Sequence, residues 1–309
     1  MSSLLSISAE VAEALDSGGP IVALESTILA HGLPRGENRV IADQIEGRVR
    51  ATGAVPATIA VLDGVVRIGL GPAELDRLCT STDIAKLSVR DVGVALALGT
   101  SGATTVASTS ALAHRAGISV FATGGLGGVH RGAAHSFDIS ADLGVLATTP
   151  VLVVCAGVKS ILDVPGTLEY LETLSVPVIG YRTDQFPGFY LSSSGEPVTW
   201  RVETPEQAAA IVLARRELST DRAGVVLANP LPVDRQLDPE LHDETLASGL
   251  AMLEAEGVTG KDVTPRLLEY FHTATHGLSL RVNVDLVLAN AELAGEVAVP
   301  LAAQTVGSR

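Results

Sequence analysis

Apolar residues along this chain gather into short continuous runs that alternate with longer segments of helical spacing. Five of the runs predict strands, at residues 21–27, 118–124, 151–157, 176–182 and 224–230. A strand that is apolar at every position has both faces covered, whereas a strand with one wet face alternates. The pattern therefore predicts an α/β fold in which helices cover both faces of a parallel or mixed sheet.

Two segments depart from this alternation. In residues 57–70 the pair Asp63-Gly64 joins two β-rich halves, which predicts a type I′ hairpin. Residues 183–201 are rich in proline, glycine and serine, and they predict an irregular loop or lid.

Helix signals are clearest in the C-terminal third of the chain. Helices are expected to begin at Thr204-Pro205 and at Thr264-Pro265, because a hydroxyl N-cap followed by proline suits the first helical turn. The apolar spacing of residues 283–297 fits a C-terminal helix that covers the sheet.

Composition supports one large domain of this class. The 309 residues are 47% hydrophobic and 18% charged, with 31 glycines and few aromatics, so Val, Ala and Leu must build the interior. No linker or low-complexity segment divides the chain, and we expect a single domain over residues 1–309. The longest apolar stretch, residues 143–158, is interrupted by polar residues and proline and is too short for a membrane helix.

Charge and cysteine content narrow the classes of function. A net charge of −14 argues against DNA or RNA as a partner, because binding a phosphate backbone needs a basic face. Cys79 and Cys155 are too few for a disulfide framework or a thiolate metal site, so we expect reduced structural thiols. The N-terminus lacks the basic segment of a signal peptide. These features predict a soluble cytoplasmic protein that binds a small molecule.

Lys159 is the first candidate for chemistry. The chain holds 18 arginines but only three lysines, Lys86, Lys159 and Lys261, and Lys159 closes the apolar run of residues 151–159. A lysine at the end of a buried strand can lose its proton through desolvation and attack a carbonyl carbon, whereas arginine stays protonated. The alternative is a lysine whose stem packs along the strand while its amine reaches water.

Glu25 ends another apolar run, residues 21–25. A carboxyl at the mouth of a buried strand should have a raised pKa, which suits a proton donor at neutral pH. A structural carboxylate with satisfied hydrogen bonds is the alternative. Lys86 is flanked by Arg90 and Asp91 and fits a surface charge equally well.

Residues 99–142 are dense in glycine, hydroxyls, histidine and aspartate. Four glycines within residues 124–128 would let backbone N–H groups approach a small phosphate, and His130 follows them; a tight glycine turn is the alternative. Asp138 and Asp142 are four apart and would share one face of a helical turn. Such hard oxygens suit Mg²⁺ or Mn²⁺ completed by water, although carboxylates at a helix start are also simple N-caps.

Together these segments resemble the pseudouridine-5′-phosphate glycosidase family, which includes indigoidine synthase A-like members. The resemblance covers nearly the whole chain through VALESTILAHGLP, GAVPATIAVLDG, residues 99–142, VVCAGVKSILD and RVNVDLVLANAELA. It implies a three-layer α/β/α sandwich around a mixed, largely parallel sheet, usually in a homotrimer, with one divalent ion, commonly Mn²⁺, per subunit. It also implies reversible cleavage of the C–C glycosidic bond of pseudouridine 5′-phosphate to uracil and ribose 5-phosphate.

The resemblance assigns roles to single residues. Glu25 in ALEST matches the proton donor, Lys159 in CAGVKS matches the lysine that bonds ribose C1′, and Asp138 in FDIS matches the metal ligand. The positions that match substrate contacts are Lys86, Val106, His130, Ser140, Ala141, Asp142 and Asn283. Of these, His130 is expected at the phosphate and Asn283 at the uracil edge.

The implied chemistry explains why a lysine is needed. A C-glycoside has no leaving-group oxygen to protonate, so the usual two-carboxylate scheme does not apply. Instead Glu25 would protonate the ring oxygen while the Lys159 amine bonds to C1′, and uracil would leave as its C5 takes a proton. Two alternatives stay open: a Schiff-base lyase of aldolase type acting on another sugar phosphate, and a non-catalytic sugar-phosphate sensor.

Overall fold

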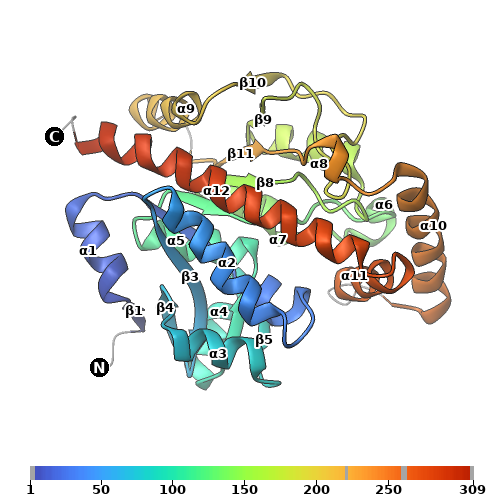
Figure 1. Ribbon diagram of the computed structural model, residues 1–309, viewed down its shortest axis with the longest axis horizontal. Coiled ribbons are helices and arrows are strands. Elements are labelled where there is room, and N and C mark those ends of the chain that lie inside the picture. Colours follow the sequence, from blue (N-terminus) through green and yellow to red (C-terminus); the bar gives the residue numbers. More distant parts are fainter. Residues whose placement is uncertain (1–3, 220–221, 259–262, 307–309) are drawn as a thin grey trace.

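Strands and helices alternate along most of the chain in the computed structural model, which describes residues 4–219, 222–258 and 263–306 (Figure 1). Lys261 lies outside the described residues. The strands are β1 (Leu5–Ile7), β2 (Ile21–Leu24), β3 (Val55–Leu62), β4 (Val65–Ile68), β5 (Ala85–Leu87), β6 (Gly102–Thr104), β7 (Val120–Ala122), β8 (Leu152–Cys155), β9 (Val178–Tyr181), β10 (Trp200–Val202) and β11 (Val225–Ala228).

The helices are α1 (Ala9–Ser17), the π-helix η1 (Ile28–Gly32), α2 (Asn38–Ala51), α3 (Pro72–Thr80), α4 (Val89–Leu98), α5 (Val106–Arg115), α6 (Ala133–Ser136), α7 (Ala141–Leu146), α8 (Val164–Thr173), α9 (Pro205–Leu218), the 3₁₀ turn η2 (Val233–Arg235), α10 (Pro239–Glu256), α11 (Val263–Ala274) and α12 (Leu278–Val306).

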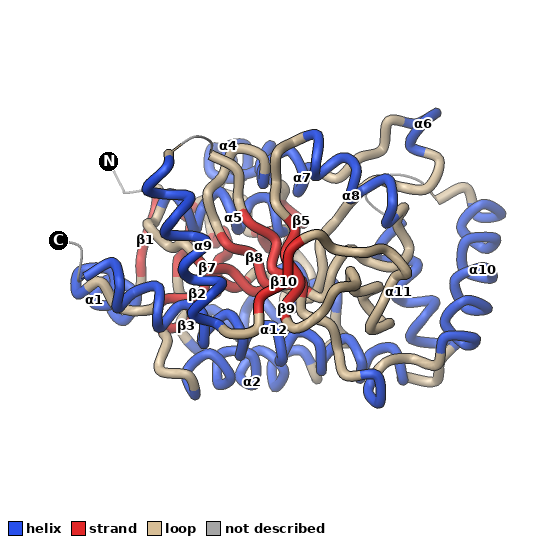
Figure 2. The backbone as a smooth tube through the Cα atoms, turned by 90° about the horizontal axis from the view of Figure 1, so that it is seen from above, coloured by secondary structure: helices blue, strands red, loops and turns tan. Residues whose placement is uncertain are grey.

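The strands join into one sheet in the order β1-β4-β3-β2-β7-β8-β11-β9-β10, with β6 on β3 and β5 on β6. Neighbours run parallel except where β3 meets β4 and β6. Helices α2, α9 and α12 pack together on one face, and α4, α5 and α7 lie on the other. Figure 2 shows the strands between these helical layers. The prediction of a three-layer α/β/α sandwich around a mixed, largely parallel sheet is confirmed.

All five predicted apolar runs contain a strand. Every residue of β2, β7, β8 and β11 is buried, as expected for strands covered on both faces. Their register aligns Leu24 with Ala122, and Ala122 with Val154. The carboxyl ends of these central strands therefore meet at one edge of the sheet, and the residues that follow them are brought together there.

The two irregular segments also match their predictions. Asp63 and Gly64 both have positive φ, 50° and 73°, between the antiparallel strands β3 and β4, as a type I′ turn requires. The segment between β9 and β10 is irregular, but it is anchored by three buried aromatic side chains, Phe186, Phe189 and Tyr190. It is therefore a fixed wall of the molecule.

Of the two predicted helix starts, the one at Thr204-Pro205 is confirmed and the one at Thr264-Pro265 is wrong. Thr204 caps α9 by accepting a hydrogen bond from the N–H of Gln207 at 3.4 Å. Helix α11 already includes Val263, so Thr264 lies inside its first turn and the predicted N-cap there is wrong. Helix α11 folds back on α10 with Leu267 directly over Gly249, where a Cβ would come within 2.3 Å of Leu267 Cδ1.

The C-terminal helix is longer than the predicted residues 283–297. Helix α12 runs from Leu278 to Val306 across the sheet, between α2 and α9 (Figure 1). Its segment Leu278–Gln304 has the length and composition of a membrane span, but 56% of its apolar window is buried inside the protein. This burial is the environment of a core helix in a soluble protein, where apolar residues cover a sheet on one side and neighbouring helices on the other.

Candidate active site

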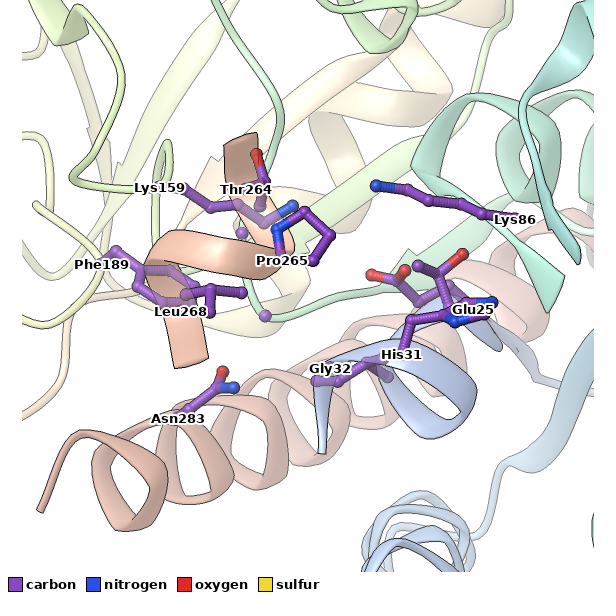
Figure 3. A pocket seen from close by; sticks show the side chains of 14 residues that line it. Glu25, His31, Gly32, Lys86, Lys159, Phe189, Thr264, Pro265, Leu268 and Asn283 are labelled. Carbon is purple, nitrogen blue, oxygen red and sulfur yellow. The ribbon is translucent and has the colours of Figure 1, made fainter. Parts of the chain in front are cut away.

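A cavity at the carboxyl edge of the central strands gathers four of the predicted site residues (Figure 3). Glu25 follows β2, Lys159 follows β8, Lys86 lies on β5 and Asn283 lies on α12. The cavity encloses about 510 Å³ of space outside the protein atoms, part of which is open to solvent. Open α/β sheets commonly bind ligands at this edge.

Glu25 is a partly buried carboxyl held by one hydroxyl group. Thr123, which follows β7, donates a hydrogen bond to Glu25 Oε1. Burial raises the pKa of Glu25, while the positive charge of Lys159 and the Thr123 hydrogen bond oppose this rise without cancelling it. A carboxyl that keeps its proton to higher pH is suited to protonate a ligand.

Two lysine side chains reach into the cavity from opposite sides (Figure 3). The backbone of Lys159 is tied to the glycine segment, because its N–H donates to Leu126 O at 3.2 Å. Lys86 is held by the pairing of β5 with β6 and points toward the same space. The cavity therefore places two amines beside one carboxyl with a raised pKa, which are the groups needed for nucleophilic attack and proton donation.

Asn283 supplies an unpaired polar atom to the cavity wall. Its side chain is only 6% exposed, and its Oδ1 has no hydrogen-bond partner among the residues that the structure describes. A buried acceptor left without a partner costs about 1–3 kcal/mol, so this atom indicates a donor on a ligand. Phe189 and Leu268 provide apolar walls nearby. A polar edge between apolar walls suits a planar base.

The glycine segment lies beside the cavity, which Gly124 and Gly125 line, and the phosphate cradle that the sequence suggested there stays a prediction. The N–H of Gly127 donates to Asp142 Oδ2 at 2.8 Å, so this amide is already used. A Cβ on Gly127 would come within 2.2 Å of Ser140 Oγ, and a Cβ on Gly125 within 2.6 Å of Phe189. Close packing of side chains against the backbone is therefore what requires glycine here.

Asp138 and Asp142 do not share a helical face. Helix α7 begins at Ala141, so Asp138 lies in the preceding loop, and Ser140 rather than an aspartate caps the helix by accepting from Asp142 N–H at 3.2 Å. The carboxylate of Asp142 is buried and also accepts from Ala107 N–H at 2.9 Å. It joins the start of α5 to the glycine segment.

The remaining predicted contacts surround this junction. Val106 is the first residue of α5 and its side chain is buried, so it can meet a ligand only through its backbone. His130 lies beside Asp138, with 3.7 Å between Nδ1 and Oδ2. Burial lowers the pKa of His130 despite the nearby carboxylate, and the charges of Lys159 and Lys86 lower it further. None of these residues lines the cavity itself, but His130 lies within range of both cavity lysines.

Asp138 is the one residue that the sequence assigned to a metal. Its partly exposed carboxylate has no contact other than His130 within the described residues, so its oxygens are open to a cation. Over residues 4–219, 222–258 and 263–306, no three His, Cys, Asp or Glu side chains gather as a metal cluster. A single carboxylate fits Mg²⁺ or Mn²⁺ that keeps most of its waters, and it does not fit the closed ligand set of a structural zinc ion.

Neither cysteine is suited to be a nucleophile. Cys79 and Cys155 are free and buried, as predicted. Burial raises the pKa of Cys79 to about 11 and that of Cys155 to about 12, so both remain thiols at neutral pH.

The sequence assigned no role to His31, which lines the cavity. It lies in η1, a wide helical turn of a kind that often occurs at functional sites. Burial and the charge of Lys86 lower the pKa of His31, while hydrogen bonds to the backbone of Ala85 and Ile84 oppose this. His31 follows Glu25 closely in the chain, but no local pattern marks a π turn.

A second feature missed by the sequence holds Thr123 in place. Asn290 on α12 is fully buried and donates from Nδ2 to Thr123 O at 2.8 Å. Its Oδ1 accepts from Asn229 Nδ2 at 3.0 Å. The amide of Asn290 within the apolar run that begins at Leu286 was the available signal. These contacts link β7, β11 and α12 behind Glu25.

Comparisons with known proteins show which sequences and folds this chain is similar to. The family model described as indigoidine synthase A like protein matches residues 10–300. The pseudouridine-5′-phosphate glycosidase of Salinispora tropica is 61% identical over 295 residues, which cover 96% of this chain and 91% of that protein. The enzyme of the same name from Streptomyces griseus is 55% identical over 296 residues, covering 96% and 92%.

Two solved structures share the fold over almost their whole length. The prealnumycin C-glycosynthase AlnA, in complex with ribulose 5-phosphate, has a TM-score of 0.91 and 39% identity, covering 99% of this chain and 100% of that one. An indigoidine synthase A-like protein from Thermotoga maritima has a TM-score of 0.87 and 34% identity, covering 96% of each chain. The chain therefore belongs to the indigoidine synthase A-like family, together with the pseudouridine-5′-phosphate glycosidases of these bacteria.

Proposed function

We propose that this protein is a pseudouridine-5′-phosphate glycosidase of the lyase type, which reversibly forms uracil and ribose 5-phosphate. The observation that carries the proposal is the cavity shared by Glu25, Lys159 and Asn283, because it combines a carboxyl whose pKa is raised by burial, an amine and an unpaired acceptor for a base. Relatives with this name at 61% and 55% identity support it, as does a neighbour of the same fold that is complexed with ribulose 5-phosphate.

The proposed reaction opens the sugar ring first. Glu25 gives its proton to the ring oxygen, while Lys159 Nζ loses a proton and bonds to C1′, breaking the C1′–O bond. The nitrogen electron pair then forms an imine as the C1′–C5 bond breaks, and C5 of the uracil takes a proton. Water adds to the imine and releases ribose 5-phosphate and the free amine.

The phosphate is proposed to lie toward the start of α5. Lys86, His130 and the backbone at Val106 surround that region, next to the junction formed by Ser140, Ala141 and Asp142. Asp138 would hold a hydrated Mn²⁺ ion, which would supply positive charge beside the phosphate. Binding energy from this remote group can position C1′ against Lys159. The proposal also places the enzyme in the cytoplasm, consistent with its two free thiols.

Borohydride trapping tests the covalent step. Wild-type enzyme reduced during turnover with ribose 5-phosphate should carry a stable adduct on the peptide that contains Lys159. Lys159→Arg should lose both adduct and activity while staying folded, and the matched Lys86→Arg variant should still form the adduct. An active Lys159→Arg enzyme would refute the mechanism. A Schiff-base lyase for another sugar phosphate would form the adduct but release no uracil from pseudouridine 5′-phosphate.

A further inference from the structure

A second hollow, lined by η1, α11 and α12, adjoins the cavity at Asn283. The two spaces share five lining residues, His31, Gly32, Pro265, Leu268 and Asn283. The second hollow, which we name the annex, encloses about 1200 Å³ of space outside the protein atoms, part of which is open to solvent. Asn283 therefore stands at the junction of the two spaces rather than at a closed end.

The annex has a largely apolar wall. Leu33, Pro34 and Leu280 line it together with the ring of Tyr190. The charged residues in its lining, Arg266 and Glu269, pair with each other at 3.1 Å, and its other polar residues beyond those shared with the cavity are His272 and Ser279. An apolar wall of this kind binds hydrocarbon or aromatic groups through burial of their surface.

The positions of Lys159 and Asn283 orient a bound base. Lys159 is drawn above and Asn283 below the side chains of Phe189 and Leu268 (Figure 3), so a uracil whose C5 is bonded to C1′ near Lys159 can direct its far edge, N1–C2–N3, toward Asn283. Asn283 Oδ1 can accept one ring N–H. The other ring nitrogen then faces the opening into the annex.

We propose that the annex is a subsite for aglycone substituents, which lets the enzyme cleave and form C-glycosides of uracils that carry an alkyl or aryl group on a ring nitrogen. The proposal rests on the proposed function, because it assumes that the base lies between Lys159 and Asn283. N1 is the favoured position, since the N1-substituted base keeps N3–H for Asn283.

Turnover of N1-methyl and N1-benzyl pseudouridine 5′-phosphate tests the subsite beside the parent compound. The wild-type enzyme should cleave both with kcat/KM within about tenfold of the parent value, the discrimination expected from a few hydrocarbon groups in an apolar pocket. Leu280→Trp should fill the annex and lower kcat/KM for the benzyl compound by about tenfold or more, while that for the parent stays within about threefold. Leu278→Trp is the matched control, because Leu278 is on the same helix, 41% exposed and outside the annex lining.

Each outcome bears on the subsite separately from the activity. Cleavage of the parent without cleavage of either analogue would overturn the annex, and so would an equal loss in the two Trp variants. No cleavage of the parent would instead refute the proposed function. Should Leu280→Trp fail to fold, Leu280→Ala provides the opposite test, since a wider annex should raise the benzyl rate relative to the parent rate. An unchanged ratio there would also overturn the proposal.

Discussion

Glu25 shows how single residues acquire their chemistry from distant parts of the chain. Its carboxyl is bonded by Thr123, 98 residues away, and Thr123 is fixed in turn by Asn290, 167 residues further on. The raised pKa of Glu25 comes first from burial at the end of β2, and the opposing charge of Lys159 does not cancel it. A donor made by burial needs this support, because a loosely held carboxyl would turn toward water and lose its shift.

The pH dependence of turnover follows from this environment. If Glu25 must be protonated to donate, kcat/KM should fall as pH rises through its raised pKa. Because the folded protein holds this proton more tightly than the unfolded chain, the free energy of unfolding should also fall as pH rises from the ordinary pKa of a glutamate to the raised one. Glu25→Gln should abolish turnover while ribose 5-phosphate still binds, as measured by calorimetry. The Glu25→Gln variant should also lack the contribution of Glu25 to the pH dependence of the free energy of unfolding. A Glu25→Gln enzyme with wild-type turnover would contradict the assignment of Glu25 as donor.

At the scale of elements, the glycine segment joins helices and strands at close range. Gly127 lies against both Ser140 and Asp142, and Asp142 connects the start of α5 to this segment. Helices α5 and α7 can approach the sheet here only because the backbone carries no Cβ. The segment is therefore a packing joint beside the cavity.

Gly127→Ala is the corresponding prediction. Its new Cβ would come within 2.2 Å of Ser140 Oγ and 2.8 Å of Asp142 Oδ2, so the junction must shift. We expect the free energy of unfolding to fall by about 1–3 kcal/mol, as in overpacked interiors. Gly47→Ala is the matched control, because Gly47 lies in α2 with nothing within 4 Å of its Cβ position. That variant should be neutral or stabilised by up to about 1 kcal/mol. Urea unfolding of both proteins checks the contrast, and equal effects would argue against a packing joint.

At the scale of the whole molecule, segments that are far apart in the chain together form one wall of the cavity at the edge of the sheet. The irregular segment between β9 and β10 supplies Phe189, α11 supplies Pro265 and Leu268, and α12 supplies Asn283. The active cavity is therefore complete only when the C-terminal helices are folded onto the sheet. The proposed metal site and the expected homotrimer belong to the same scale, since both would depend on surfaces formed by the finished fold.

If the protein holds the proposed Mn²⁺ ion, its removal should lower turnover without unfolding the protein. Asp138 would be a lone carboxylate ligand, so we expect weak binding and ready stripping by EDTA, with activity restored by Mn²⁺ at least as well as by Mg²⁺. Electron paramagnetic resonance should detect bound Mn²⁺ in the wild type and not in Asp138→Asn. Full activity after EDTA treatment, or unchanged Mn²⁺ binding in the variant, would contradict the proposed metal site at Asp138.

The homotrimer that the family resemblance implies is a separate prediction. Light scattering should then report a mass of about 95 kDa, three times the subunit mass of 31.7 kDa.

Several features of this protein were determined by the sequence alone. The strands were predictable because a strand buried on both faces must be apolar along its length, and this condition is local. The turn at Asp63-Gly64 was predictable because two positive φ angles demand particular residues. Long contiguous motifs around Glu25 and Lys159 identified the family, and both residues follow apolar runs whose strands end at the same edge of the sheet.

Other features were decided only by the tertiary structure. No local pattern connects the segments that meet at the site. Asp142 is hydrogen-bonded to Ala107, Thr123 is supported by Asn290, and His31 enters the cavity. The conformational freedom of the glycines near residue 127 is visible in the sequence, whereas the side chains packed against them, such as Ser140 against Gly127, are visible only in the structure. Periodicity reports how one element is buried, but contacts between elements depend on how the whole chain packs, and that packing placed the polar groups of the site.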